Sequence, residues 1–92
     1  MKRTASGSRG NGSRVEARLR AIVEGCGVHE NERERYLAFA RTLLRSLRRP
    51  PGPDYSPRTK RVVQRFFERG LRARLLVAIG REIEAWLFGQ WR

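Results

Sequence analysis

Apolar residues recur every three or four positions along most of the chain, which is the period of an α-helix that buries one face. The first segment of this kind is predicted to begin at Ser13, because Ser13 and Glu16 have the spacing of a capping box. It ends at Gly25 and Gly27, since glycine readily adopts the left-handed conformation that follows a helix. Its predicted apolar face consists of Val15, Leu19, Ile22, Val23 and Cys26.

A second helix is predicted to start near Asn31, with Glu34 three residues later, and to stop at the segment RRPPGPDY. Consecutive prolines remove amide donors and hold the backbone extended, so the helix cannot continue through them. Arg41, Arg45 and Arg48 form a row without acidic residues beside the apolar face of this helix. The apolar face itself consists of Tyr36, Leu37, Phe39, Ala40, Leu43, Leu44 and Leu47.

A third helix is predicted from Ser56, its N-cap, with Pro57 at the first helical position, where proline is favoured. At about 100° per residue its apolar residues fall on one arc of about 140°, which predicts that both Phe66 and Phe67 are buried. An adjacent arc of about 80° carries only cations. These five cations are Arg58, Arg61, Arg65, Arg69 and Arg72.

Gly70 is expected to separate the third helix from a fourth. If one helix ran through this glycine, the apolar residues on its two sides would lie on nearly opposite faces and could not share a core. A turn at Gly70 removes this conflict, and glycine adopts turn conformations at little cost. The apolar face of the fourth helix consists of Leu71, Leu75, Leu76, Ala78, Ile79, Ile83, Trp86 and Leu87.

These patterns predict an all-α protein, a bundle of four helices around one core in residues 13–92. The third and fourth helices would form a helix-turn-helix-like pair. No segment shows the alternation of a strand. Residues 1–12 contain no large apolar residue after Met1, and we expect them to form a disordered basic tail.

The charge of the chain is the strongest indication of function. Its 92 residues include 21 lysines and arginines and 9 acidic residues, a formal net charge of +12. The charge is concentrated, because residues 36–75 hold eleven cations and two acids, which gives +9. A charge this large favours a polyanionic partner, whereas a charge that served solubility alone would be more evenly spread.

Residues that could support catalysis or metal binding are scarce. Cys26 and His29 have C-x-x-H spacing, but a structural zinc site needs four ligands, and the chain has no other cysteine or histidine. The acidic segments ENERE and REIE alternate with arginine at helical spacing, which is typical of a salt-bridged solvent face. No cofactor-binding motif is present. We therefore expect no enzymatic activity, no metal and no cofactor.

The cellular location is predicted from three features. A single cysteine cannot form an internal disulfide and suits a reducing compartment. The N-terminal segment MKRTASGSRGNGS lacks the apolar region of a secretory signal. The longest apolar run, Leu75–Ile79, is far shorter than the roughly 20 residues of a membrane span. These features predict a cytoplasmic protein.

The predicted function is nucleic-acid binding, mainly through phosphate contacts from a cationic helix face. DNA is favoured over RNA, because Phe66 and Phe67 are expected in the core and are then not available to stack on bases. Thr59, Lys60 and Gln64 could face a groove. The predicted binding residues are Arg41, Arg45, Arg48, Arg58, Lys60, Arg61, Arg65, Arg69 and Arg72. Glu84 lies in the charge-balanced C-terminal segment and is expected to take no part.

The alternative is a protein–protein interaction module without a nucleic-acid role. In the C-terminal segment AWLFGQW, Phe88 and Trp91 lie outside the predicted apolar face and could contact another chain. The partner would be an acidic protein or a second copy of this chain. A homodimer would also suit DNA binding, because symmetric proteins read paired half-sites.

Two segments, YLAFARTLL and YSPRTKRVVQRFF, are loosely similar to the DNA-clamping helical domain of tyrosine recombinases. The shared features are a Ser-Pro-x-Thr helix start and aliphatic spacing, both of which occur in many helices. No catalytic domain follows in this chain, and the chain is not assigned to that family.

Overall fold

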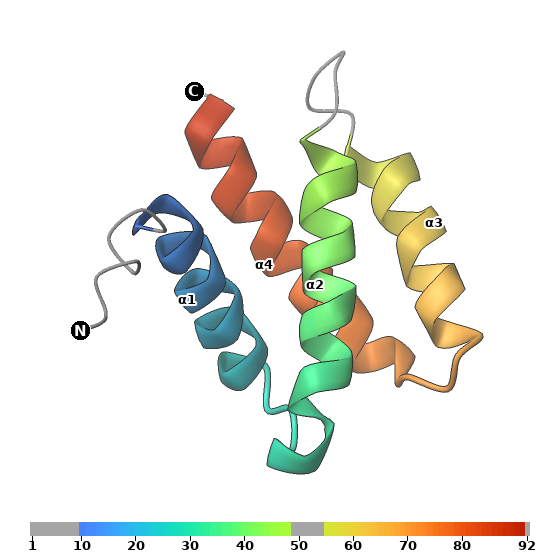
Figure 1. Cartoon of the computed structure of the whole chain (residues 1–92). Coiled ribbons are helices and arrows are strands. Elements are labelled where there is room, and N and C mark those ends of the chain that lie inside the picture. The colour runs from blue at the N-terminus through green and yellow to red at the C-terminus, as the bar shows by residue number, and fades with distance from the viewer. Residues whose placement is uncertain (1–9, 49–54, 92) are drawn as a thin grey trace.

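Helix α2 (Arg33–Leu47) lies in the middle of the molecule and contacts each of the other three α-helices in the described part of the chain. Helices α1 (Gly10–Gly25) and α3 (Tyr55–Phe67) flank it on opposite sides and do not contact each other (Figure 1). Helix α4 (Ala73–Trp91) crosses behind α2 and packs against all three. This computed structural model describes residues 10–48 and 55–91, with side chains for 14–48 and 55–89.

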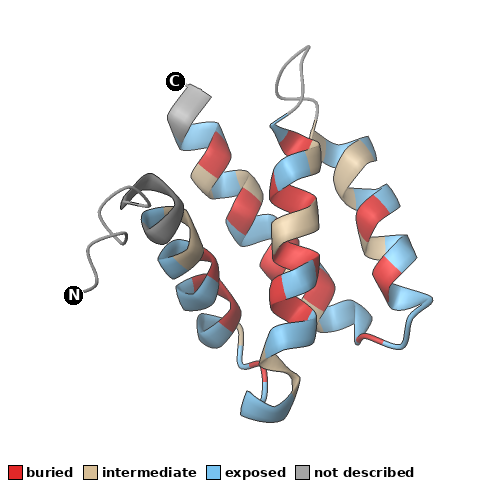
Figure 2. Ribbon diagram, in the orientation of Figure 1, coloured by how far each residue is buried: buried red, intermediate tan, exposed pale blue. Residues whose placement is uncertain are grey.

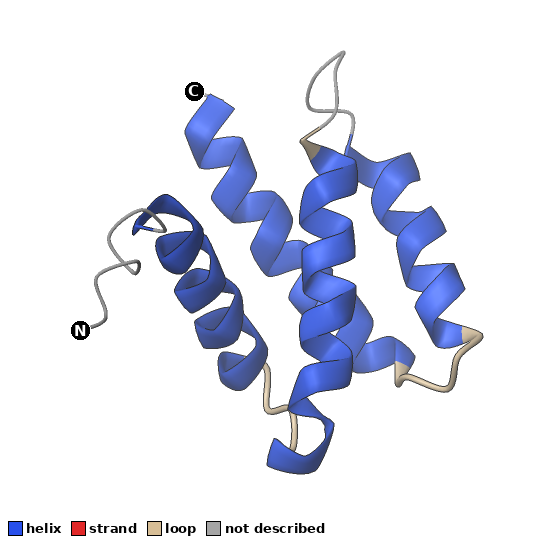
Figure 3. Cartoon of the chain, viewed as in Figure 1, coloured by secondary structure: helices blue, strands red, loops and turns tan. Residues whose placement is uncertain are grey.

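All regular structure in these residues is helical, with no strand among them, as Figure 3 shows. The predicted all-α class and the four helices are therefore confirmed. The remaining element is a short 3-10 turn, η2 (Glu30–Glu32), directly before α2. Positions 1–9 of the predicted tail and most of the proline-rich connection, residues 49–54, lie outside the described residues.

The core is built around the apolar face that the periodicity predicts for α2. Every residue of that face is buried, and Leu37, Phe39 and Leu43 have no exposed surface (Figure 2). Phe39 meets Phe66 of α3 edge to face, with ring centroids 5.4 Å apart. Helix α4 contributes the buried side chains of Leu76, Ile79, Ile83 and Leu87. Burying each side chain of this size stabilises the fold by about 1.5–3 kcal/mol.

The predicted start of the first helix was wrong, and the helical segment that starts near Asn31 has a different capping residue from the one predicted. Helix α1 begins at Gly10, three residues before the expected cap at Ser13. Glu16, the expected partner in a capping box, instead accepts hydrogen bonds from Arg41 of α2. Before α2 the capping group is His29, whose Nδ1 accepts the amide of Asn31 at 3.2 Å and so starts the η2 turn.

The predicted break at Gly70 is confirmed, because α3 ends at Phe67 and α4 begins at Ala73. Gly70 has a φ of +99°, a conformation that glycine adopts without steric cost. Tyr36 of α2 fixes the turn, since its buried hydroxyl accepts the backbone amide of Arg72 at 2.8 Å. The pairing of α3 and α4 as a DNA-binding helix-turn-helix stays a prediction.

One predicted core residue was wrong. Phe66 is 5% exposed, as expected, but Phe67 is 50% exposed. Helix α3 lies at the edge of the bundle and contacts only α2 and α4. These two neighbours cover an arc that includes Val62 and Phe66 and leaves out the adjacent Phe67. The covered arc is therefore narrower than the apolar arc of the sequence.

Candidate nucleic-acid interface

The ion pairs among the described residues gather on one side of the molecule. Among the described residues there are three pairs, and each uses a glutamate of α1. Glu16 pairs with Arg20 and Arg41, and Glu24 pairs with Arg33. The glutamates of α1 thus neutralise cations at the interface of α1 and α2, and no described acid does the same for α3.

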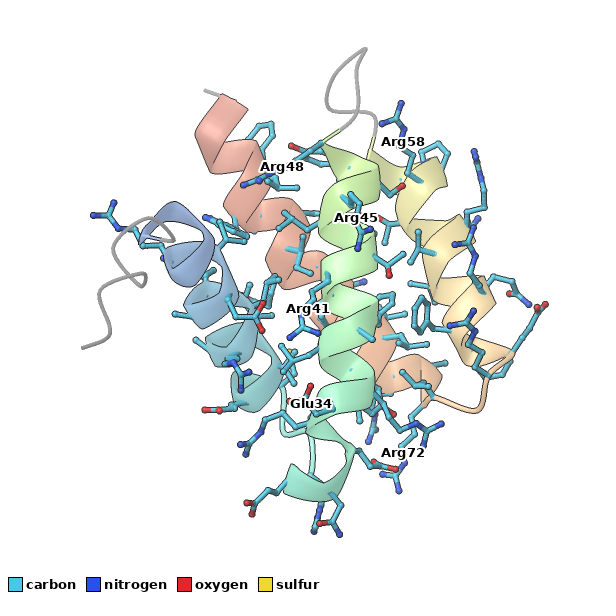
Figure 4. All side chains as sticks on the ribbon, viewed as in Figure 1. Glu34, Arg41, Arg45, Arg48, Arg58 and Arg72 are labelled. Atoms are coloured by element: carbon cyan, nitrogen blue, oxygen red, sulfur yellow. The ribbon has the colours of Figure 1, made fainter. Side chains whose placement is uncertain are left out.

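Among the predicted binding residues, Arg41 is the one whose charge is neutralised by a glutamate of α1. The row of Arg41, Arg45 and Arg48 has no acid in the sequence, but α1 brings Glu16 to it. Arg41 Nε donates to Glu16 Oε1 at 3.1 Å, and a second guanidinium nitrogen donates to the other carboxylate oxygen. The hydrogen bond from Arg41 lowers the pKa of Glu16. In Figure 4 Arg41 lies on the side of α2 that faces α1.

The five predicted cations do not line a single helix. Only Arg58, Arg61 and Arg65 belong to α3, because the helix ends at Phe67. Arg69 lies in the following turn with its guanidinium carbon 5.0 Å from the centroid of the Phe66 ring. Arg72 precedes α4 and lines a different hollow, beside η2. The turn at Gly70, which the phase of the apolar residues predicted, is the reason that the row cannot continue.

The structure brings one residue of the α2 row together with the α3 cations. Arg45 and Arg65 line the same cleft between α2 and α3, together with Thr42, Ser46 and Val62. Both arginines are exposed at its edge. Neither has an ion pair or a hydrogen bond with any described residue of the protein.

Two further arginines link α2 to the α3 region through backbone carbonyls. Arg58 Nη1 donates to the carbonyl of Ser46 at 3.0 Å, and Arg35 Nη2 donates to the carbonyl of Arg69 at 3.3 Å. These bonds keep both guanidinium charges at the junction of the two helices. We name the resulting surface the α2–α3 cationic face. Arg45 and Arg65 line its cleft, and Arg61 lies three residues after Arg58 and four before Arg65 on α3, so these three α3 residues share one side of the helix. Its full set of cations is Arg35, Arg45, Arg58, Arg61, Arg65 and Arg69.

Two other predicted binding residues lie apart from this face. In Figure 4 Arg48 lies on the other side of α2 from Arg58, in front of the C-terminal half of α4. Lys60 lines a groove of about 600 Å³ between α3 and α4, which it shares with Arg81, Val77 and other residues. The predicted cations are thus divided among several surfaces.

Thr59 and Glu84 also line the α3–α4 groove, and their contacts there differ from the roles expected of them. Thr59 does not present a free hydroxyl for base contacts, because its Oγ1 donates to Glu84 Oε2. Glu84 is therefore part of the packing of α3 on α4. Gln64 remains exposed, and its amide donates to Glu68 at 3.0 Å.

Sequence reasoning missed Arg35, Thr42 and Ser46. Thr42 and Ser46 are the only hydroxyl-bearing residues of α2 apart from Tyr36, and they stand three residues before and one residue after Arg45. Thr42 is therefore a neighbour of both Arg45, three residues later, and Ser46, four residues later, on the helix surface, and this spacing could have drawn attention to the group. Arg35 had no such signal, since its partner is a carbonyl 34 residues away.

The remaining candidate groups contribute no site. Among the described residues no cluster of three or more possible metal ligands forms. Burial raises the pKa of the Cys26 thiol. Trp86 packs against the core with the guanidinium of Arg18 5.9 Å from its ring centroid, and Phe88 is 55% exposed. Trp91 is the last residue of α4, and its side chain lies outside the described part of the chain.

No described helix combines the length and the apolar character needed to cross a bilayer. The chain was also compared with protein-family models, curated proteins and solved structures, and none of them matches it. The functional assignment therefore depends on the geometry and charge of its own residues.

Proposed function

We propose that this protein binds nucleic acid, with DNA favoured, through the α2–α3 cationic face. The observation that carries the proposal is the separation of charge. The described ion pairs all lie on the α1 side, whereas Arg45, Arg61 and Arg65 make no ion pair or hydrogen bond within the described part of the chain. Cations held without acids repel one another, and a polyanion relieves that repulsion.

The dimensions of the face suit a phosphate backbone. Arg58 and Arg65 are seven residues apart on α3, which corresponds to a rise of about 10 Å. Successive phosphates of one DNA strand advance by about 3.4 Å along the duplex axis, so with α3 parallel to that axis this row would span about three nucleotides. Arg45 adds a cation from the neighbouring helix. Contacts of this kind give affinity without base specificity.

The preference for duplex DNA over single strands needs its own support, because half-exposed Phe67 is a possible stacking surface. Its neighbour Phe66 is buried and cannot stack on a base. One exposed ring is less than the several aromatic side chains that single-strand binders use along a groove. We therefore retain the duplex as the favoured partner, and competition between duplex and single-stranded DNA measures the preference directly.

The test compares two alanine substitutions of exposed arginines. Arg65 belongs to the cationic face, whereas Arg81 of α4 lines the separate α3–α4 groove and has no ion pair with a described residue. Fluorescence anisotropy with random duplex DNA should show that Arg65→Ala weakens binding by about tenfold or more on every sequence and that Arg81→Ala changes little. Equal binding by the parent and both variants would contradict the proposal.

A protein-interaction role is the second candidate, and the observation that favours it is the 55% exposure of Phe88 near the end of α4. Exposed aromatic residues are enriched in protein interfaces. Sedimentation of the chain with and without duplex DNA separates the two roles. A concentration-dependent dimer that does not bind DNA would support the second candidate and contradict the first.

A further inference from the structure

The cleft between α2 and α3 has a lining suited to one small anion. Its volume is about 220 Å³, and its lining consists of Thr42, Arg45, Ser46, Val62 and Arg65. Four of these side chains carry hydrogen-bond donors, and none is acidic. At about 30 Å³ per water molecule, the space holds about seven waters, enough for a phosphate group with part of its hydration shell.

The donors that line the cleft are not used by the protein. The hydroxyls of Thr42 and Ser46 make no hydrogen bond with described residues, and the guanidinium groups of Arg45 and Arg65 make none either. The backbone carbonyl of Ser46 accepts from Arg58, whereas its hydroxyl has no partner among the described residues. Arginine forks bind phosphate oxygens in pairs, and hydroxyls donate to the oxygens that remain.

The two walls of the cleft are fixed in position. The bond from Arg58 to the Ser46 carbonyl joins α3 to α2 near the start of α3. The bond from Arg35 to the Arg69 carbonyl joins α2 to the turn after α3. Below them, Phe39 and Phe66 pack edge to face in the core. Because the two helices are already joined at both ends of the cleft, little backbone entropy is lost when an anion binds.

The lining also discriminates against larger ligands. Among the described residues that line the cleft, Val62 is the one with an apolar side chain, and it is 4% exposed. A nucleobase needs an aromatic or broad apolar surface to stack on, and this cleft offers none. The same donors would also bind sulfate or free phosphate, so the class of ligand that fits the cleft is a tetrahedral oxyanion.

We propose that this cleft is a phosphate pocket and that it seats one backbone phosphate of a bound nucleic acid. That the phosphate comes from a nucleic acid rests on the proposed function. That the cleft binds an oxyanion rests on the residues of the cleft alone. The proposed pocket predicts that the positive charge of Arg65 alone does not give full affinity for the phosphate. The fork of its guanidinium and the hydroxyl of Thr42 must also contribute.

The experiment uses variants that keep the charge. Arg65→Lys preserves the cation but loses the fork, and Thr42→Val removes only a hydroxyl. With duplex DNA at fixed salt, we expect Arg65→Lys to weaken binding about tenfold, the effect of one charge-assisted hydrogen bond, and Thr42→Val about threefold. Arg81→Lys is the matched control and should bind like the parent. Circular dichroism confirms that each variant is folded.

The outcomes separate the pocket from the proposed function. If Thr42→Val and Arg65→Lys bind duplex DNA like the parent, the pocket is overturned, although salt-dependent binding by the parent still supports the function. If the parent does not bind DNA, the function and the nucleic-acid source of the phosphate both fail. Titration with inorganic phosphate then tests the pocket alone, because shifts of the Thr42 and Arg65 side-chain NMR signals support it and their absence overturns it.

Discussion

Phe66 is the side chain through which α3 is anchored to the core, so its truncation should be among the most damaging substitutions in the protein. The ring is 5% exposed, lies edge to face with Phe39 at 5.4 Å, and supports the guanidinium of Arg69 on its outer side. Truncation of a buried phenylalanine to alanine costs about 3–5 kcal/mol. That range already includes the aromatic pair, which is worth about 0.5–1.5 kcal/mol.

The adjacent Phe67 provides an internal control of the same residue type on the same helix. It is 50% exposed, so only about half of the 1.5–3 kcal/mol available from full burial applies to it. Phe67→Ala should therefore cost about 1 kcal/mol. A small domain has about 5–15 kcal/mol of total stability, so the two variants should differ clearly.

Urea unfolding followed by circular dichroism and tryptophan fluorescence measures both variants. With a slope of about 1–2 kcal/mol/M, Phe66→Ala should lower the midpoint by about 2–3 M, and Phe67→Ala by less than 1 M. The slope should stay unchanged, which shows that the unfolded reference has not altered. Equal losses for the two variants, or a larger loss for Phe67→Ala, would refute the placement of α3.

Three further predictions concern the contacts between helices. The hydrogen bond from Arg41 holds the pKa of Glu16 below its ordinary value of 4.5. The pair therefore stabilises the fold above that value, by less than about 1 kcal/mol at a partly exposed site, and the contribution is lost as the pH falls through the lowered pKa. Glu16→Gln should remove that share of the pH dependence in thermal unfolding. Tyr36→Phe removes the acceptor of a turn amide and should lower the free energy of unfolding by about 1 kcal/mol, whereas no loss would contradict the hydrogen bond. Gly70→Ala places a Cβ at a φ of +99° and should cost about 1–2 kcal/mol, and an unchanged midpoint would argue against that turn.

The parts of the fold that the sequence predicted are those decided by local periodicity. The apolar face of α2 repeats over four turns, and the change of phase at Gly70 requires a break, so both follow from helical geometry. Phe67 was misplaced because the sequence does not show how much of an edge helix its neighbours cover. Helix α1 begins three residues before Ser13, and the sequence does not show that Glu16 pairs with Arg41, 25 residues away.

The candidate site was predicted only in part. Residues 36–75, where the charge is concentrated, supply five of the six cations of the α2–α3 cationic face, namely Arg45, Arg58, Arg61, Arg65 and Arg69. Which cations share a surface depends on how α3 packs on α2, and no periodicity in the chain encodes that. The cleft lined by Thr42 and Ser46 could not be predicted for the same reason, because its walls come from two different helices.

The salt dependence of DNA binding tests the central claim most directly. If the six cations of the α2–α3 cationic face contact phosphates, a plot of log K against log salt for random duplex DNA should have a slope of about −5 or steeper. Arg65→Ala should flatten that slope by about one unit, and Arg81→Ala should leave it unchanged. A parent slope flatter than about −2, or the same slope for Arg65→Ala as for the parent, would contradict the account.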